Sequence, residues 1–210
     1  MDSSRGDPIR ASFFLDKGGV GKTTAAAHMG VALHDDGYDV LLIDLAGKQG
    51  DLAKHFGIWP QVREEEDDWP NVATVFQDQW DAIAEKVPDA VEGLIWETEE
   101  GPDIIPAHRD LDGLDDQLGN IDDARDRYSR LDEFLNEYVD GYDVILVDLP
   151  GSTSNVSYNG IWATKNVIAP VLPGSFEEDQ AAELRRDLER IEANQGISIE
   201  LAMLVINGID

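Results

Sequence analysis

The chain has 210 residues, 42% of them hydrophobic, and these numbers suit residues 1–210 forming a single domain around one large core. No apolar run is long enough to cross a membrane, and the polar first ten residues do not resemble a secretory signal, so we expect a cytoplasmic protein. Cysteine is absent, which excludes disulfides, a thiolate nucleophile and a cysteine-held iron–sulfur cluster in this chain.

The charge balance is strongly acidic, with 44 Asp and Glu against 16 Lys and Arg and a formal net charge of −28. Apolar periodicity along the chain argues against an acidic disordered protein. We therefore interpret the carboxylates as a folded surface adapted to high salt (halophilic), where repulsion between charges is screened within about 3 Å at 1 M. The alternative is an ordinary acidic cytosolic protein. A nucleic-acid binder usually carries a basic stripe, and this chain has none on the scale of the domain, so any contact with DNA would need a small local patch.

Predicted strands and helices alternate from the first strand onward. Apolar runs predict strands at residues 11–15, 40–44, 91–96, 103–105, 144–148, 167–171 and 201–206. Helical spacing predicts helices at residues 23–34, 52–56, 72–86, 121–139, 155–164 and 177–194, with an acidic loop at 63–68. This alternation indicates an α/β fold of the P-loop NTPase type, a mostly parallel twisted sheet with helices on both faces. The last strand has no helix after it, so we expect the domain to continue beyond residue 210.

A glycine-rich loop joins the first predicted strand to the first predicted helix. The tail Gly21-Lys22-Thr23 fits the P-loop pattern, although the first glycine of that pattern is replaced by Asp16. Main-chain amides in such a loop, with the positive end of the helix, bind phosphates. Lys22 would reach the β- and γ-phosphates of ATP, and the Thr23 hydroxyl would hold Mg²⁺. The expected nucleotide-binding residues here are Gly18, Gly19, Val20, Gly21, Lys22, Thr23 and Thr24.

Two aspartates end predicted strands on the same side of the sheet as this loop. Asp44 follows Val-Leu-Leu-Ile and Asp148 follows Val-Ile-Leu-Val. Ligands of open parallel sheets bind beyond the carboxyl ends of the strands, so both carboxylates are expected at the phosphates. One of them can order Mg²⁺ and the other can orient an attacking water. Taken singly, each could equally be a strand-end acid that caps a loop.

The segment Lys17-Gly-Gly-Val-Gly-Lys-Thr-Thr24 resembles the deviant Walker A motif of the ParA/MinD family of ATPases. That resemblance implies that Lys17 crosses a dimer interface and contacts the phosphates of the other subunit, in the manner of an arginine finger. The alternative is an ordinary exposed lysine.

The two acidic strand ends also resemble motifs of this family, with departures. Residues 142–152 are similar to the Walker B strand and loop, which implies Asp148 as the metal residue, although Gly151 replaces a proline. Residues 43–52 are similar to the second acidic motif, which implies that Asp44 positions the attacking water. Ala46 replaces that motif's second aspartate, and one extra residue before Gln49 leaves the register of its Gln-Gly pair open.

The resemblance extends to segments around residues 103–107 and 168–173 and to the end of the last predicted strand. Asn207 there is similar in place to the asparagine with which the family contacts adenine, which makes it a candidate nucleotide-binding residue. An Asn-Gly pair after a strand is also a common turn.

Together these features predict a Mg²⁺-dependent ATP hydrolase that forms an ATP-bound homodimer. Lys17, Lys22 and Asp44 are its catalytic candidates, Thr23 and Asp148 its metal ligands, and ATP and Mg²⁺ its cofactors. The resemblance implies a switch in chromosome or plasmid partitioning, or in cargo positioning, with a partner protein that stimulates hydrolysis.

Three other functions stay open. A membrane-associated division-positioning ATPase of the MinD type would need an amphipathic helix near its C-terminus, which residues 1–210 lack. An iron–sulfur carrier on this fold is disfavoured by the absent cysteines, and an amide-forming ligase would leave Lys17 without a partner phosphate.

Arginines that could contact DNA lie among acidic residues in two predicted helices. Arg185, Arg186 and Arg190 alternate with carboxylates in residues 177–194, and Arg125, Arg127 and Arg130 do so in residues 121–139. Such alternation favours a solvated, salt-bridged face over a phosphate-binding patch. The four histidines, which lack metal-ligand spacing, are interpreted as ordinary surface or core residues: His28, His34, His55 and His108.

Overall fold

Six parallel strands form one sheet in the computed structural model, which describes residues 6–47, 50–65, 69–172 and 177–208. The strands are β1 (Ile9–Phe13), β2 (Val40–Asp44), β3 (Asp103–Ile105), β4 (Val144–Asp148), β5 (Asn166–Val171) and β6 (Glu200–Ile206). Their spatial order is β3-β2-β4-β1-β5-β6. Strands β2 and β4 are buried at every position, as continuous apolar runs predict for strands covered on both faces.

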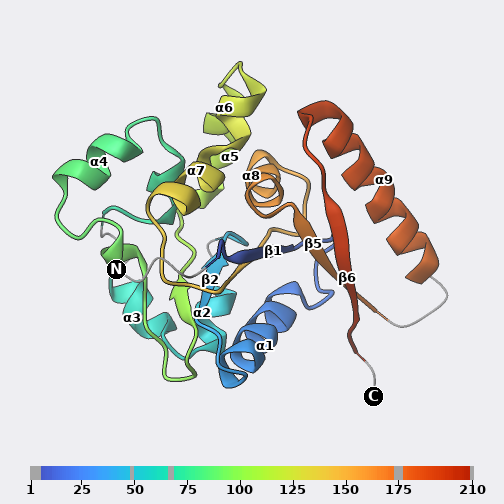
Figure 1. The fold of residues 1–210 in the computed structure, drawn as a ribbon, viewed down its shortest axis with the longest axis horizontal. Helices are drawn as coiled ribbons and strands as arrows, with labels where there is room; N and C mark the ends of the chain where they lie inside the picture. The colour runs from blue at the N-terminus through green and yellow to red at the C-terminus, as the bar shows by residue number, and fades with distance from the viewer. Residues whose placement is uncertain (1–5, 48–49, 66–68, 173–176, 209–210) are drawn as a thin grey trace.

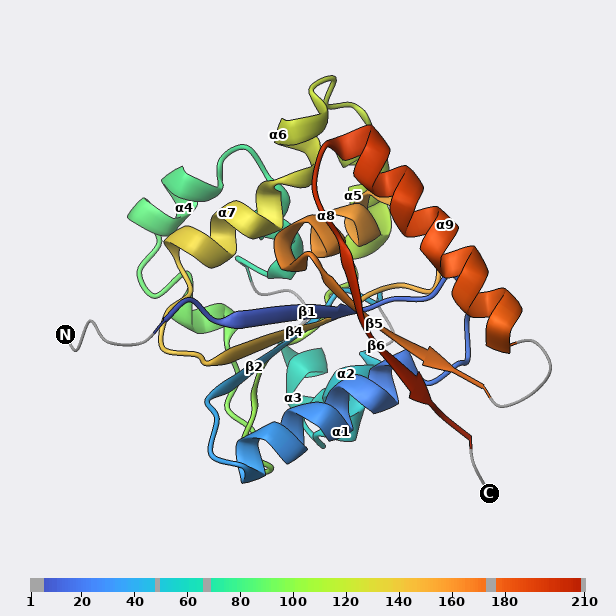
Figure 2. The same cartoon turned by 45° about the vertical axis from the view of Figure 1, so that its right-hand side comes forward.

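Helices cover both faces of this sheet, as the alternation of elements predicts (Figures 1 and 2). One face carries α1 (Lys22–Asp35), α2 (Asp51–His55) and α3 (Trp59–Glu64). The other carries α4 (Trp80–Lys86), α5 (Leu111–Gly119), α6 (Ala124–Tyr128), α7 (Arg130–Glu137), α8 (Asn155–Thr164) and α9 (Glu177–Gln195). The predicted fold class is therefore confirmed.

Each face of the sheet contributes to its own apolar core, because side chains alternate along a strand. Leu42, Leu146 and Phe13 pack with Ala26 and Ala27 of α1 in one core. On the opposite face, the larger core joins side chains of β2, β4 and β5 to α5, α7, α8 and α9. Trp80 of α4 belongs to it, with edge-to-face contacts to Phe134 and Tyr138 at ring separations of 5.4 and 5.8 Å.

Three sequence predictions for the region between β2 and β4 are wrong. The helix predicted at residues 72–86 is a 3₁₀ helix, Val72–Phe76, followed by α4, because Asn71 and Thr74 form a capping box that starts its own short helix. The strand predicted at residues 91–96 is a 3₁₀ helix, Glu92–Leu94, and a single antiparallel bridge from Trp96 to Ile104.

The third error is the helix predicted at residues 121–139, which the structure divides into α6 and α7. Asp123 accepts hydrogen bonds from the amides of Arg125 and Asp126 and so begins α6, and Ser129 separates the two helices. Between β3 and α6, α5 was not predicted. The predicted acidic loop at 63–68 overlaps the end of α3, and its residues 66–68 lie outside the described part of the chain.

Strand β6 forms one edge of the sheet and leaves apolar side chains in solvent. It pairs with β5, with an irregularity in register between Val167 and Ile168. Met203, Leu204 and Ile206 are between 44% and 52% exposed. Within the described residues, no helix is both long and apolar enough to cross a membrane.

Candidate nucleotide-binding site

The glycine-rich loop lies between β1 and α1, next to the carboxyl ends of β2 and β4. Phe13 of β1 pairs with Asp148 of β4, and Asp148 pairs in register with Asp44 of β2. Parallel pairing of three neighbouring strands therefore brings both predicted carboxylates to the edge of the sheet where the loop begins.

The loop adopts a conformation that requires glycine at its junction with α1. Gly21 has a φ of 88°, in the left-handed region, and precedes the first residue of the helix. A Cβ at Gly21 would lie 2.0 Å from Nδ2 of Asn207, so no side chain fits there without displacing that amide.

Lys22 is buried, and its ammonium group lies on the loop's own main chain. Its Nζ donates to the carbonyl oxygens of Lys17 at 3.0 Å and Leu15 at 3.4 Å. Burial lowers the pKa of Lys22, while the nearby Asp148 opposes that effect. A Cβ at Gly151 would lie 3.0 Å from the same Nζ, so the loop after β4 also limits the space around this ammonium.

Thr23 and Asp148, the predicted metal ligands, are in direct contact. The Thr23 hydroxyl donates to Oδ2 of Asp148 at 2.6 Å. The other carboxylate oxygen, Oδ1, is buried and has no hydrogen-bond partner among the described residues. Burial raises the pKa of Asp148 to about 6, opposed by the Thr23 hydrogen bond and by Lys22. A hydroxyl beside an unpaired carboxylate oxygen fits a hard cation such as Mg²⁺, which prefers oxygen ligands.

Asp44 is fully buried and held by the main chain that follows it. Its Oδ1 accepts from the amide of Ala46 at 2.9 Å, and its Oδ2 accepts from the amide of Leu52 at 3.4 Å. Burial and the neighbouring Asp148 raise the pKa of Asp44 to about 8. These contacts fix the carboxyl group in position at the end of β2.

A cavity of about 710 Å³ adjoins these groups. Its walls come from the glycine-rich loop, the segment after β2, α2 and the segment after β4. The lining residues are Gly18, Gly19, Gly21, Lys22, Thr23, Thr24, Ala46, Asp51, Lys54, His55, Leu149 and Gly151. The sequence analysis left the register of Asp51 in the second acidic motif open, interpreted His55 as an ordinary residue and did not consider Lys54.

The remaining predicted nucleotide-binding and catalytic residues, in the glycine-rich loop and just after β6, do not line this cavity. Lys17 is exposed, beside Asp16 and the α9 residues Glu183 and Asp187. Val20 is buried beneath the loop. Asn207 donates from Nδ2 to the carbonyl oxygen of Val20 at 3.0 Å, so in this structure it braces the loop. Gln49 lies outside the described residues, whereas Gly50 lies against the Trp59 ring.

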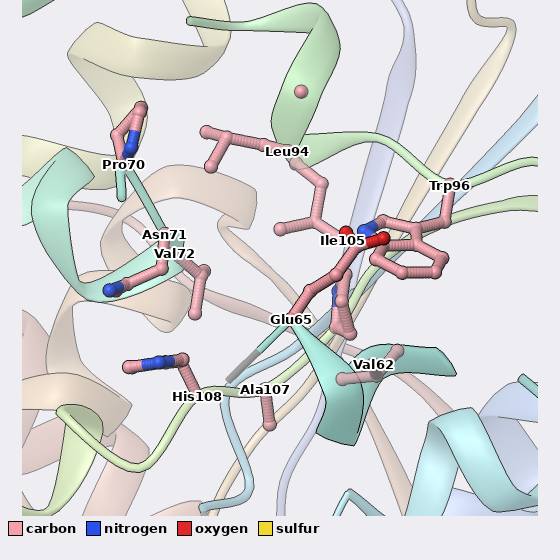
Figure 3. A pocket seen from close by; sticks show the side chains of 12 residues that line it. Val62, Glu65, Pro70, Asn71, Val72, Leu94, Trp96, Ile105, Ala107 and His108 are labelled. Carbon is pink, nitrogen blue, oxygen red and sulfur yellow. The ribbon is translucent and has the colours of Figure 1, made fainter. Parts of the chain in front are cut away.

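A second hollow, near the end of β3, is too small for a nucleotide (Figure 3). Its volume is about 60 Å³, and Val72, Leu94, Trp96 and Ile105 give it a mainly apolar lining. Among the described residues, no group of three or more His, Cys, Asp or Glu side chains could hold a metal by itself.

Two of the six arginines discussed in the sequence analysis form ion pairs with carboxylates, and a third donates to a carbonyl oxygen. Arg190 pairs with Asp187 at 3.2 Å, and Arg130 pairs with Asp78 at 2.5 Å. Arg127 donates from Nε to the carbonyl oxygen of Ile121 at 2.8 Å.

Comparison with known proteins places these features in a family. The model of a family described as AAA domain matches residues 11–201. The chromosome partitioning protein ParA of Caulobacter vibrioides is 31% identical over 97% of this chain and 71% of its own length. The chromosome-partitioning ATPase Soj of Thermus thermophilus is 30% identical over 96% of this chain and 70% of its own.

Among solved structures, the cobyrinic acid a,c-diamide synthase of Mycobacterium smegmatis, with a bound ATP analogue and magnesium, is similar to this chain with a TM-score of 0.72. It is 26% identical and matches 94% of this chain and 72% of its own.

Proposed function

Because this chain belongs to the ParA/MinD family of P-loop ATPases, we propose that it binds and hydrolyses ATP with Mg²⁺ as a switch in DNA partitioning. The same switch could position another cargo, and we place it in the cytoplasm. The observation that carries the proposal is one arrangement: the glycine-rich loop, the Thr23–Asp148 hydrogen bond and Asp44 meet beside a single cavity.

In this proposal the loop holds the phosphates by its main chain. Amides of residues 18–24 and the first turn of α1 provide donors for anionic oxygens. Lys22 exchanges its hydrogen bonds to the Lys17 and Leu15 carbonyls for bonds to phosphate. Burial disfavours the charged form of the ammonium, and a phosphate next to it would favour that form.

Thr23 and Asp148 are the groups that would hold Mg²⁺. The unpaired Oδ1 of Asp148 and the Thr23 hydroxyl offer oxygen ligands at the phosphate side of the cavity. Bound there, Mg²⁺ would neutralise negative charge on the phosphates. Burial raises the pKa of Asp148 in this structure. Cation binding would favour the ionised form of its carboxyl group.

Asp44 is the candidate for orienting the attacking water. The amides of Ala46 and Leu52 keep its carboxyl group in place, as a water-positioning group requires.

Lys17 completes the proposed site from the other subunit of a dimer. Its side chain is exposed, and within the described ranges it has no hydrogen bond or ion pair. An exposed cation at the start of the loop is free to approach the phosphates of a second copy. By analogy with arginine fingers, it would raise turnover by about 10³-fold or more.

The test is the size of the protein in molar salt with ATP and Mg²⁺, with ADP, and without nucleotide. We expect a dimer with ATP alone, a monomer for Lys17→Ala in every condition, and loss of nucleotide binding for Lys22→Ala. Lys86→Ala, an exposed lysine of α4, is the matched control. An unchanged monomer of the wild type in all conditions would overturn the dimer switch, and retained turnover in Lys22→Ala would overturn its assigned role.

The amide-forming function is the second candidate, because the matched synthase shares this fold at a TM-score of 0.72. The relatives that match almost the whole chain at 30–31% identity are partitioning proteins, which favours the first proposal. ATP-dependent dimerisation that requires Lys17 separates the two, since a ligase gives Lys17 no partner phosphate. A stimulating partner protein and DNA as cargo also belong to the first proposal.

We also infer adaptation to high salt from the net charge of −28. Screening of surface repulsion should raise the free energy of unfolding as KCl increases from about 0.1 M to above 1 M. A denaturant midpoint that stays constant over this range would contradict it.

A further inference from the structure

The helix α2 contributes a polar wall to the nucleotide cavity. It follows the segment that begins at Asp44, and it packs against α1 on one face of the sheet (Figure 2). Three of its five residues line the cavity, namely Asp51, Lys54 and His55.

His55 is the member of this wall that reaches the phosphate loop. Its Nε2 lies 3.4 Å from Oγ1 of Thr24, in the first turn of α1. Both side chains line the same cavity. In the part of the chain that the structure describes, Nδ1 of His55 has no hydrogen-bond partner, so the ring retains a nitrogen for a ligand.

The distribution of cationic groups favours a role for this wall in binding phosphates. Four of the six lysines lie between residues 17 and 54, although the chain carries a net charge of −28. Lys54 is already engaged, because its ammonium donates to Asp51 at 2.8 Å and lies 5.3 Å from the centre of the Trp59 ring. The imidazole of His55 has no such carboxylate partner among the described residues and remains available for an anion.

We propose that His55 is a further nucleotide-binding residue, which donates a hydrogen bond to the α- or β-phosphate of a bound nucleoside di- or triphosphate. This inference rests on the proposed ATPase function. The assignment to the inner phosphates follows from Thr24. In P-loops the main-chain amides cradle the α- and β-phosphates, whereas the lysine reaches the β- and γ-phosphates. Thr24 lies in the first turn of α1, two residues after Lys22.

A contact to the inner phosphates stabilises bound ADP and bound ATP alike. His55→Ala should therefore weaken the binding of both nucleotides by a similar factor, on the order of tenfold, as expected for one partly exposed hydrogen bond to a charged group. His55→Lys, which keeps an N–H donor at this position, should recover most of this affinity.

The experiment is titration calorimetry of the full chain with ADP and with a non-hydrolysable ATP analogue, in Mg²⁺ and molar KCl. His28→Ala is the matched control, because His28 is an exposed histidine of α1 that does not line the cavity. Lys22→Ala reports on the phosphate loop itself. If His55→Ala lowers the thermal midpoint of the nucleotide-free protein, His55→Phe, which keeps a ring but has no donor, replaces it as the test variant.

Each outcome decides the inference. Similar losses for ADP and the ATP analogue in His55→Ala, with wild-type affinity in His28→Ala, support it. Wild-type affinity in His55→Ala overturns it, and a loss for the ATP analogue alone overturns the assignment to the inner phosphates. In both of those cases, loss of binding in Lys22→Ala supports the proposed nucleotide site independently of His55. A wild type that binds neither nucleotide overturns both.

Discussion

The buried carboxyl group of Asp44 predicts an unusual dependence of stability on pH in the nucleotide-free protein. Its pKa is raised from 3.8 to about 8 by burial and by Asp148. The folded state therefore retains a proton at pH 6–8 that the unfolded state releases. Stability falls wherever the folded state binds more protons, so the free energy of unfolding should decrease as pH rises toward 8.

The size of this effect follows from the pH range in which Asp44 is protonated in the folded state and ionised in the unfolded state. Each pH unit contributes about 1.4 kcal/mol for one retained proton. Between pH 5.5 and 8 the loss is therefore about 3 kcal/mol, and Asp148, with a pKa of about 6, adds a smaller part at the acidic end. Ordinary carboxyl groups are already ionised throughout this window.

Urea unfolding at a series of pH values, in molar KCl with a chelator and without nucleotide, measures this slope. Asp44→Asn should flatten it, because the variant carries no proton to lose. Asp122→Asn, which removes an exposed carboxylate, should keep the wild-type slope. A wild type equally stable at pH 5.5 and 8, or an Asp44→Asn variant with an unchanged slope, would refute the reasoning.

Three further substitutions test the site and the core. Gly21→Ala should lose nucleotide affinity and thermal stability, because the new Cβ would lie 2.0 Å from Nδ2 of Asn207, and wild-type values in calorimetry would contradict this. Thr23→Val should cost about 1–3 kcal/mol of unfolding free energy by leaving the Asp148 carboxylate without its 2.6 Å hydrogen bond, and should abolish Mg²⁺-dependent binding. Trp80→Ala should cost about 3–5 kcal/mol, since its ring is 4% exposed in the larger core; a change below about 1 kcal/mol in urea would rule out that packing role.

The central strands of the sheet could be predicted because each is a continuous run of apolar residues. Continuous apolar runs identify β2 and β4 with their observed ends, and the strand order brings Asp44 and Asp148 together as the sequence predicts. The helix α8 also begins and ends at the predicted residues.

The errors lie where short polar contacts decide the backbone. The side chains of Asn71 and Asp123 accept hydrogen bonds from main-chain amides and so begin new helices. The apolar pattern around each had predicted one continuous helix. The helix α5 was missed although Leu111, Leu114 and Leu118 form its buried face, because a glycine and three aspartates separate them.

In the candidate site, local sequence motifs predicted the glycine-rich loop and the two carboxylates. Contacts between residues far apart in the sequence could not be predicted from these motifs. The hydrogen bond from Asn207 to Val20 spans almost the whole sequence. The contact of His55 with Thr24 depends on how α2 packs against α1, which no spacing along the chain encodes. The functional roles of these residues remain predictions that the variants above address.

The exposed apolar side chains of β6 affect how the size measurements with and without ATP should be interpreted. In the part of the chain that the structure describes, β6 pairs with β5 alone, and a strand edge without a partner can recruit a strand from another molecule. Its exposed side chains include Met203, Leu204 and Ile206. Self-association through β6 would not depend on nucleotide, would become stronger in molar salt, and would persist in the Lys17→Ala variant. A charged residue in place of Leu204 should suppress it, which leaves any remaining ATP-dependent dimer attributable to the phosphate-loop face.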